Sequence, residues 1–119
     1  MLTSLFFTNC TADQLPEPQP PGDCGTEPVT YLSDIADIID RSCAYSGCHL
    51  DSAPGVYDSY EGLLGVLQSG LFKERVVTIK DDPNLGMPPD FAVANRPKDL
   101  TTDELSLIRC WLEDGFPKQ

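Results

Sequence analysis

The sequence predicts an all-α fold of three to four helices, and three observations support this class. Two segments, 32–39 and 60–67, carry apolar residues at intervals of three and four, which is the spacing of one helical face. A third segment, 101–112, begins with a capping-box pattern and continues with the same spacing. With 119 residues and a Pro-rich beginning, the chain has room for one small domain, a size at which a disulfide, a metal or a cofactor commonly reinforces the core.

The first helix is expected to begin at Tyr31 or Leu32 and to end near Ser42. Its apolar face consists of Leu32, Ile35, Ala36, Ile38 and Ile39. Thr30 or Ser33 is expected to cap the N-terminus, because a hydroxyl oxygen can accept a hydrogen bond from a free backbone N–H of the first turn.

The second helix is expected over residues 59–68, followed by a stop at Ser69 and Gly70. Its apolar residues are Tyr60, Leu63, Leu64 and Leu67. The short apolar run 76–79 fits either a helical turn or a strand, and its periodicity does not distinguish the two.

A long connection, 81–100, separates this run from the last helix and is rich in Pro, Asp and Asn. Connections of this length in a small domain are usually functional, and Gly86-Met87-Pro88-Pro89 lies at the centre of this one. The last helix follows a capping box at 101–104 and is expected to stop at Gly115 and Pro117. Its apolar face is Leu105, Ile108, Trp111 and Leu112, and Trp111 is expected to pack in the core.

The N-terminal segment differs in composition from the rest of the chain. A short apolar run ends in Asn9-Cys10, which resembles the end of a bacterial lipoprotein signal although Asn9 departs from the usual small residue there. We therefore expect residues 1–10 to be the remnant of such a signal, with Cys10 lipidated; the alternative is a secreted chain in which Cys10 is free or paired. Residues 11–30 contain five prolines and are expected to form a stalk, leaving 31–119 as the domain.

The formal net charge of −11 excludes some partners. Nucleic acid and anionic bilayer surfaces are both negative, so neither is expected to bind, and any contact with a membrane would be through a lipid anchor only. The acidic surface either serves solubility alone or docks a basic protein partner.

The chemistry of the chain is concentrated in Cys43-Ala44-Tyr45-Ser46-Gly47-Cys48-His49. Covalent attachment of haem uses two thiols, which join the two vinyl groups of the porphyrin, and an imidazole directly after the second thiol, which binds the iron. Four residues separate the thiols here instead of the usual two, so the loop must bulge, and Ser46-Gly47 is the expected position.

Two other interpretations of these residues stay open. Cys43, Cys48 and His49 could bind zinc, with Cys24 or Cys110 as a fourth ligand, although adjacent Cys and His are awkward ligands for one tetrahedral ion. Cys43 and Cys48 could instead form a simple disulfide. Neither alternative accounts for the Met-Pro-Pro loop.

Counting residues narrows the choice of axial iron ligands. His49 is the only histidine, and Met87 is the only methionine apart from Met1. We expect His49 on the proximal side of the iron and the thioether of Met87 on the distal side. The alternatives are that Met87 is a core residue and that Lys73, Lys80 or no side chain fills the distal position.

With these motifs the chain resembles the c-type cytochromes, in particular planctomycete-type domains, some of which use the longer C-x4-C-H attachment. The similarity covers residues 31–116 and includes Tyr60-Glu61-Gly62-Leu63, the Met87-Pro88-Pro89 loop and the last helix, in the same order. It implies a cytochrome c-like fold in which the first and last helices cross and one covalent haem lies between them and the loops. It also implies contact between the two ends of the domain and hence a disulfide between Cys24 and Cys110, the alternative being a buried Cys110 thiol. Candidate partners for the haem propionates are Arg75, Arg96 and Lys98.

The sequence therefore favours a monohaem electron carrier, not an enzyme, in an extracytoplasmic respiratory or redox chain. We expect it at the periplasmic face or the cell surface, lipid-anchored to a bacterial membrane, with redox proteins as partners. Two alternatives remain: a haem peroxidase-like enzyme with an open distal site, and a non-haem module in which the cysteines bind zinc or form disulfides. The absence of a second histidine counts against the enzyme.

Overall fold

The computed structural model describes residues 24–93 and 95–119. Within them the chain forms α-helices, two π-helical turns and no strand: η1 (Tyr31–Ile35), α1 (Ala36–Ser42), α2 (Tyr60–Gln68), α3 (Leu71–Lys73), η2 (Glu74–Thr78) and α4 (Thr102–Glu113). This content confirms the all-α class for the described part of the chain.

The first helix consists of η1 continued by α1 and has the expected bounds. Thr30 is its cap: the hydroxyl accepts a hydrogen bond from the Ser33 N–H at 3.2 Å, and the Thr30 N–H donates to the Asp34 carboxylate at 3.0 Å. Ile35 and Ile39 are fully buried, as the periodicity predicts. The prediction for Leu32 is wrong, since this side chain is 56% exposed. The π-helical first turn contains more residues per turn than an α-helix, so Leu32 is rotated away from the apolar face.

Helix α2 begins after Ser59, whose hydroxyl accepts a hydrogen bond from the Gly62 N–H at 3.1 Å. It ends where Gly70 adopts a left-handed conformation, and α3 and η2 follow as one helical segment. The ambiguous run 76–79 is therefore helical through Thr78, and Val76 is buried against the core. Between η2 and α4, no helix or strand occurs in the described residues of the long connection.

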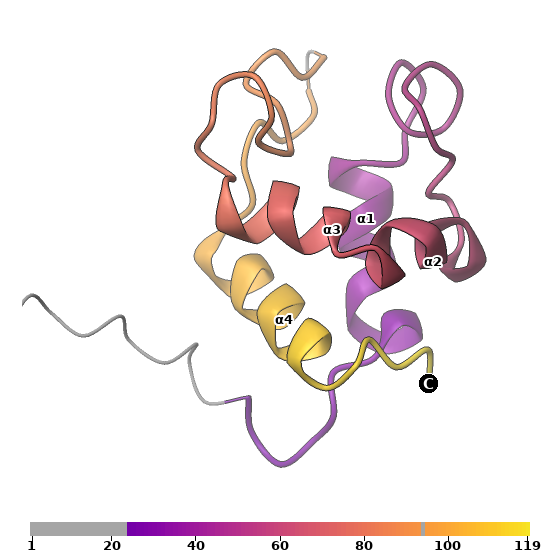
Figure 1. The fold of residues 1–119 in the computed structure, drawn as a ribbon, viewed down its shortest axis with the longest axis vertical. Helices are drawn as coiled ribbons and strands as arrows, with labels where there is room; N and C mark the ends of the chain where they lie inside the picture. Colours follow the sequence, from indigo (N-terminus) through magenta and orange to yellow (C-terminus); the bar gives the residue numbers. More distant parts are fainter. Residues whose placement is uncertain (1–23, 94) are drawn as a thin grey trace, which may run out of the picture.

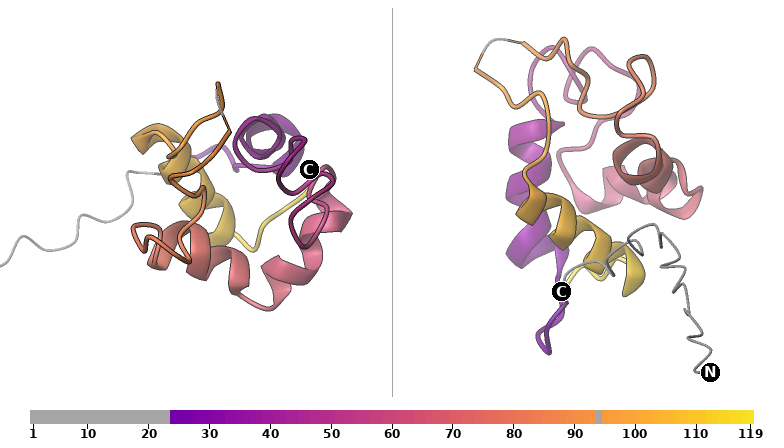
Figure 2. Two further views of the ribbon diagram at one scale, coloured as in Figure 1. Left: turned by 90° about the horizontal axis from the view of Figure 1, so that it is seen from above. Right: turned by 90° about the vertical axis from the view of Figure 1, so that its left-hand side faces the viewer.

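Helix α4 crosses the first helix, as Figures 1 and 2 show. The capping box is present: Thr101 Oγ1 accepts from the Glu104 N–H at 3.1 Å, and the Glu104 carboxylate accepts from the Thr101 N–H at 2.9 Å. Glu104 also pairs with Arg41 of α1 at 2.6 Å. Trp111 is fully buried, with its ring centroid 6.3 Å from that of Tyr31, so it belongs to the core between the two helices.

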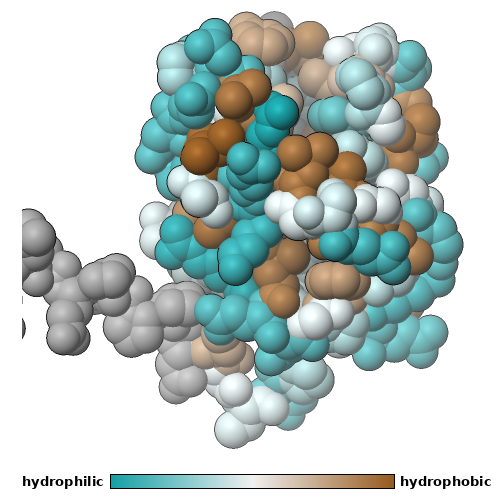
Figure 3. All heavy atoms as spheres, viewed as in Figure 1, coloured by the Kyte–Doolittle hydropathy of each residue, from teal (hydrophilic) through white to brown (hydrophobic). Residues whose placement is uncertain are grey.

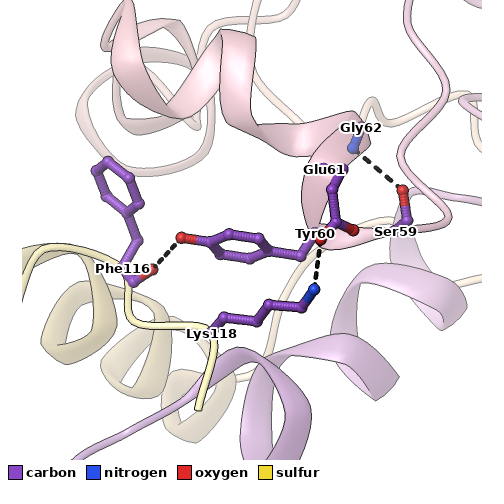
Figure 4. A network of polar contacts seen from close by, with 6 residues as sticks. All are labelled: Ser59, Tyr60, Glu61, Gly62, Phe116 and Lys118. Carbon is purple, nitrogen blue, oxygen red and sulfur yellow. Dashed lines mark hydrogen bonds and ion pairs between the residues drawn. The ribbon is translucent and has the colours of Figure 1, made fainter.

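The C-terminal tail closes one end of the molecule. Tyr31 and Leu32 donate backbone hydrogen bonds to the carbonyls of Pro117 and Lys118, at 3.0 and 3.1 Å. Figure 4 shows the second attachment of the tail: the Tyr60 hydroxyl donates to the Phe116 carbonyl at 2.9 Å, and the Lys118 ammonium pairs with the Glu61 carboxylate.

The expected disulfide is present between Cys24 and Cys110, whose Cα atoms are 5.6 Å apart. Val29 and Thr30 are buried, so the last residues assigned to the stalk pack on the domain. Cys10, the signal remnant and residues 11–23 of the stalk lie outside the described residues. In the described ranges, the helices are all too short or too polar to span a bilayer.

Candidate functional site

A cavity of about 370 Å³ brings together the four residues singled out as haem ligands and attachment points. Cys43, Cys48 and His49 line it from the loop after α1, and Met87 lines it from the long connection. These two segments are far apart in the sequence but lie at the same end of the molecule (Figure 1). The volume is within the range of about 300–1,000 Å³ that small-molecule and cofactor pockets occupy.

The remaining wall of the cavity is predominantly apolar. Val66, Leu71, Phe72 and Val76 line it from the helical segments between the two loops. Phe91 also lines it and is 75% exposed, so this part of the wall reaches the molecular surface. Figure 3 shows apolar side chains among polar ones in the upper half of the molecular surface, in the same view as Figure 1. Such a wall suits an apolar ligand with a few polar groups.

The bulge between the two thiols lies at the expected position. Gly47 has a φ of +93°, a conformation that disfavours residues with a Cβ atom. The Asp51 carboxylate holds the bulge closed by accepting hydrogen bonds from the Gly47 N–H at 2.8 Å and the Ser46 hydroxyl at 2.7 Å. These bonds, with a further one from the Ser52 hydroxyl, lower the pKa of Asp51. The four residues between the thiols thus form an ordered turn that the Asp51 carboxylate stabilises.

Both cavity cysteines are free thiols in the structure. Burial raises the pKa of the Cys43 thiol to about 12, with a smaller contribution from the nearby Cys48. At neutral pH this thiol is therefore uncharged, which matches its apolar surroundings.

The imidazole of His49 is held through one of its two nitrogens. Nδ1 lies 2.9 Å from the carbonyl oxygen of Pro54 and 3.3 Å from that of Gly55. A carbonyl oxygen only accepts, so Nδ1 carries the proton and donates it. Nε2 then keeps its lone pair, which is the tautomer that binds a metal through Nε2.

Met87 is fixed by the backbone on both sides of the loop. Its N–H donates to the Arg75 carbonyl at 3.0 Å, and the Met87–Pro88 peptide bond is cis. At Gly86 the chain approaches the Lys80 carbonyl so closely that a Cβ atom would lie 2.1 Å from its oxygen, so only glycine fits. The half-buried Met87 side chain is consequently presented to the cavity by a constrained loop.

Two hydroxyl groups at the cavity are buried without a normal hydrogen bond to any nitrogen or oxygen of the described residues. They belong to Ser42 and Tyr45, and both residues line the cavity. Burial raises the pKa of the Tyr45 phenol to about 12, and the adjacent Cys48 thiol, a weak hydrogen-bond partner, contributes to the rise. Buried polar groups are normally satisfied, so such a pair beside a cavity indicates room for a ligand with polar atoms.

The three cations expected near the propionates occupy different places. Arg75 lines the cavity and donates to the Leu85 carbonyl at 3.2 Å. Arg96 lies over the Tyr45 ring, 4.6 Å from its centroid. Lys98 lines a separate neighbouring cavity of about 230 Å³. Arg75 is therefore the candidate in direct contact with the main cavity.

The structure also bears on the alternative that the cavity cysteines and His49 bind zinc. Cys24 and Cys110, the two candidates for a fourth zinc ligand, are bonded to each other. Across residues 24–93 and 95–119, no three His, Cys, Asp or Glu side chains are grouped as ligands of a metal ion. Haem requires no such group, because the porphyrin supplies four ligands and the protein only the axial ones.

Sequence patterns did not indicate the groups that support His49. Tyr57 stacks on the imidazole, with ring centroids 4.4 Å apart and an angle of 22° between the planes, and the carbonyls of Pro54 and Gly55 bind Nδ1. Sequence patterns did not indicate the role of Asp51 either. No motif points to these residues; the one available signal is that all of them follow His49 within eight positions.

Comparisons of the chain with protein-family models, with curated proteins and with solved structures find no match.

Proposed function

We propose that this protein is a monohaem c-type cytochrome that carries single electrons outside the cytoplasm. The observation that carries the proposal is the single cavity lined by Cys43, Cys48, His49 and Met87. Those four side chains are the two thiols, the imidazole and the thioether that a covalently bound, six-coordinate haem requires. The crossing of the first helix and α4 agrees with the cytochrome c-like fold that the sequence resemblance implies.

The residues present fit the group chemically. Each free thiol would add across one vinyl group: a C–S bond forms, the thiol hydrogen passes to the other vinyl carbon, and no oxidant is consumed. His49 has the tautomer in which Nε2 can bind iron, since Nδ1 donates to carbonyl oxygens. The hydroxyls of Ser42 and Tyr45, buried without a partner nitrogen or oxygen among the described residues, and the guanidinium of Arg75 would meet polar atoms of the ligand.

In an electron carrier, the side chains of this cavity would have two tasks: binding the iron and excluding water. When bound, haem supplies an iron that alternates between ferrous and ferric states. His49 and Met87 would both hold the iron, which would leave no position for a substrate and would limit rearrangement when the charge changes. The apolar wall that includes Phe72 and Val76 would keep water from the buried part of the ligand and would favour the less charged ferrous state.

The setting of the protein is part of the proposal. The disulfide between Cys24 and Cys110 suits an oxidising compartment. A lipid on Cys10 would anchor the chain to a bacterial membrane at the periplasmic face or the cell surface. Partners would be redox proteins, and the net charge of −11 favours those with a basic docking surface.

The test is production of the full chain in a bacterial host that matures c-type cytochromes. We expect a Soret band, a polypeptide mass increased by one haem, and a band in a denaturing gel that stains for haem peroxidase activity. The C43S/C48S variant should lose the stained band, because haem is then no longer covalently held.

The C24S/C110S variant is the matched control, since it removes two cysteines that lie outside the cavity. Its stained band should persist even though its stability falls. Wild-type protein with its bare polypeptide mass and no Soret band would refute the proposal.

A further inference from the structure

The segment that follows His49 returns to the imidazole and packs a second aromatic ring on it. The Tyr57 N–H donates to the His49 carbonyl at 2.9 Å, which closes a loop of nine residues. This bond brings the Tyr57 ring parallel to the imidazole, at a centroid distance of 4.4 Å. Tyr57 is half-buried and is itself part of the cavity wall.

The stack supplies a restraint that the hydrogen bonds of His49 lack. The carbonyls of Pro54 and Gly55 hold the Nδ1 edge of the imidazole, but a ring held at one edge can still tilt. A parallel aromatic face limits this tilt, because the stacking contact is lost when the planes diverge. The Tyr57 ring is itself supported by the backbone, since a Cβ atom on Gly55 would lie 2.6 Å from it.

We infer that Tyr57 is a positioning residue that fixes the plane of the His49 imidazole and thereby the electronic state of the iron. The inference rests on the proposed function. The orientation of an axial imidazole decides which iron d orbitals it overlaps, and groups outside the ligand shell set that orientation. The aromatic face, rather than the phenolic hydroxyl, carries this role.

The test compares Y57F, which keeps the ring, with Y57L, which replaces the ring by a smaller apolar side chain. Both are produced as the full-length haem protein. We expect ferric Y57F to have the wild-type electron paramagnetic resonance spectrum, and Y57L to show shifted and broadened g values. We also expect a lower reduction potential for Y57L, because water reaches the space left by the ring.

The control is Y60L, which removes a tyrosine whose hydroxyl binds the tail at Phe116 and which is not among the residues of the cavity wall. It should lower the melting temperature and leave the g values unchanged, so loss of stability alone does not produce the signature. A Y57L spectrum identical to wild type, or a Y57F spectrum shifted as much as that of Y57L, would overturn the role of Tyr57.

A measurement on the wild type does not depend on whether Y57L folds. In the diamagnetic ferrous protein, nuclear Overhauser contacts between the Tyr57 ring protons and the His49 imidazole are expected, and their absence would refute the stack. A wild-type chain without haem refutes the proposed function and this inference together. Haem-loaded protein without the contacts refutes the inference alone.

Discussion

At the scale of single residues, the candidate site consists of a few side chains of distinctive chemistry that line one cavity. Met87 is the residue whose role is most open to a direct test, because Lys73 and Lys80 were alternatives for the distal position. Lys80 pairs with Asp81 at 2.8 Å and lines the neighbouring cavity, whereas Met87 lines the main one.

We therefore expect M87A to keep its covalent haem but to bind cyanide rapidly in the ferric state. The thiols and His49 remain in this variant, while the distal position is open. K73A and K80A, the controls, should resist cyanide as the wild type does. Absorption spectra during a cyanide titration make the comparison, and unchanged resistance of M87A would remove Met87 from the ligand set.

Asp51 provides a second prediction at this scale. The D51A variant loses the carboxylate that accepts hydrogen bonds from Ser46 and Gly47, so the bulge between the thiols is less ordered. We expect a smaller fraction of chains to carry both thioether bonds, as measured by mass spectrometry after proteolysis. D58A, which changes an exposed carboxylate at the end of the same loop, should mature normally; equal yields for the two variants would contradict the role given to Asp51.

At the scale of elements, the contact between α1 and α4 depends on a carboxylate with several partners. Burial alone raises the pKa of Glu104, but the hydrogen bonds from Thr101 and Arg41 outweigh it and hold the pKa below its ordinary value of 4.5. A carboxylate with a depressed pKa in the folded state stabilises the fold above its unfolded pKa, and this contribution is lost as the pH falls through the folded value.

We expect E104Q to melt at a lower temperature than wild type at pH 7 and the difference to narrow as the pH falls below 4.5, the ordinary pKa of a glutamate. Thermal melts across this range measure it. E113Q, an exposed position on the same helix, should differ less from wild type at pH 7. A difference between E104Q and wild type that does not vary with pH would show that charge plays no part.

Thr101 offers an independent test of the same helix end. T101A removes one half of the capping box and should lower the free energy of unfolding by about 1 kcal/mol. Denaturant titrations would detect this change.

The sequence predicted those elements whose signals are local. The caps at Thr30 and Thr101, the bulge at Gly47 and the ends of three helices all follow from residues that contact near neighbours in the chain. Leu32 was misplaced because periodicity assumes α-helical geometry, and nothing in its neighbours marks a π-helical turn. The run 76–79 could not be assigned, since tertiary packing decides short apolar segments.

The site was predicted in the same uneven way. Residues with distinctive chemistry, such as Cys48, His49 and Met87, were identifiable as candidates because few other side chains can attach a haem or bind its iron. Tyr57 and Asp51 were not, because tyrosine and aspartate occur throughout the chain and only the folded loop brings these two to His49 and Gly47.

At the scale of the whole molecule, the bond between Cys24 and Cys110 joins residues 86 positions apart. A cross-link of this length removes much of the conformational freedom of the unfolded chain, worth roughly 4 to 5 kcal/mol in the chain-entropy model. We expect the C24S/C110S variant to melt about 15 °C below wild type, or further. C10S should melt as the wild type does, and a C24S/C110S variant with the wild-type melting temperature would show that the bond is dispensable.

The position of this disulfide also determines which end of the domain is joined to the upstream part of the chain. Residues 24–30 and the C-terminal tail lie at the end of the domain opposite the loops that enclose the cavity (Figure 1). The chain upstream of Cys24 is therefore attached at this end of the domain, where a disulfide joins Cys24 to α4. Under the proposed function, a domain attached at this end presents Phe91 and the opening beside it away from the attachment, toward its redox partners.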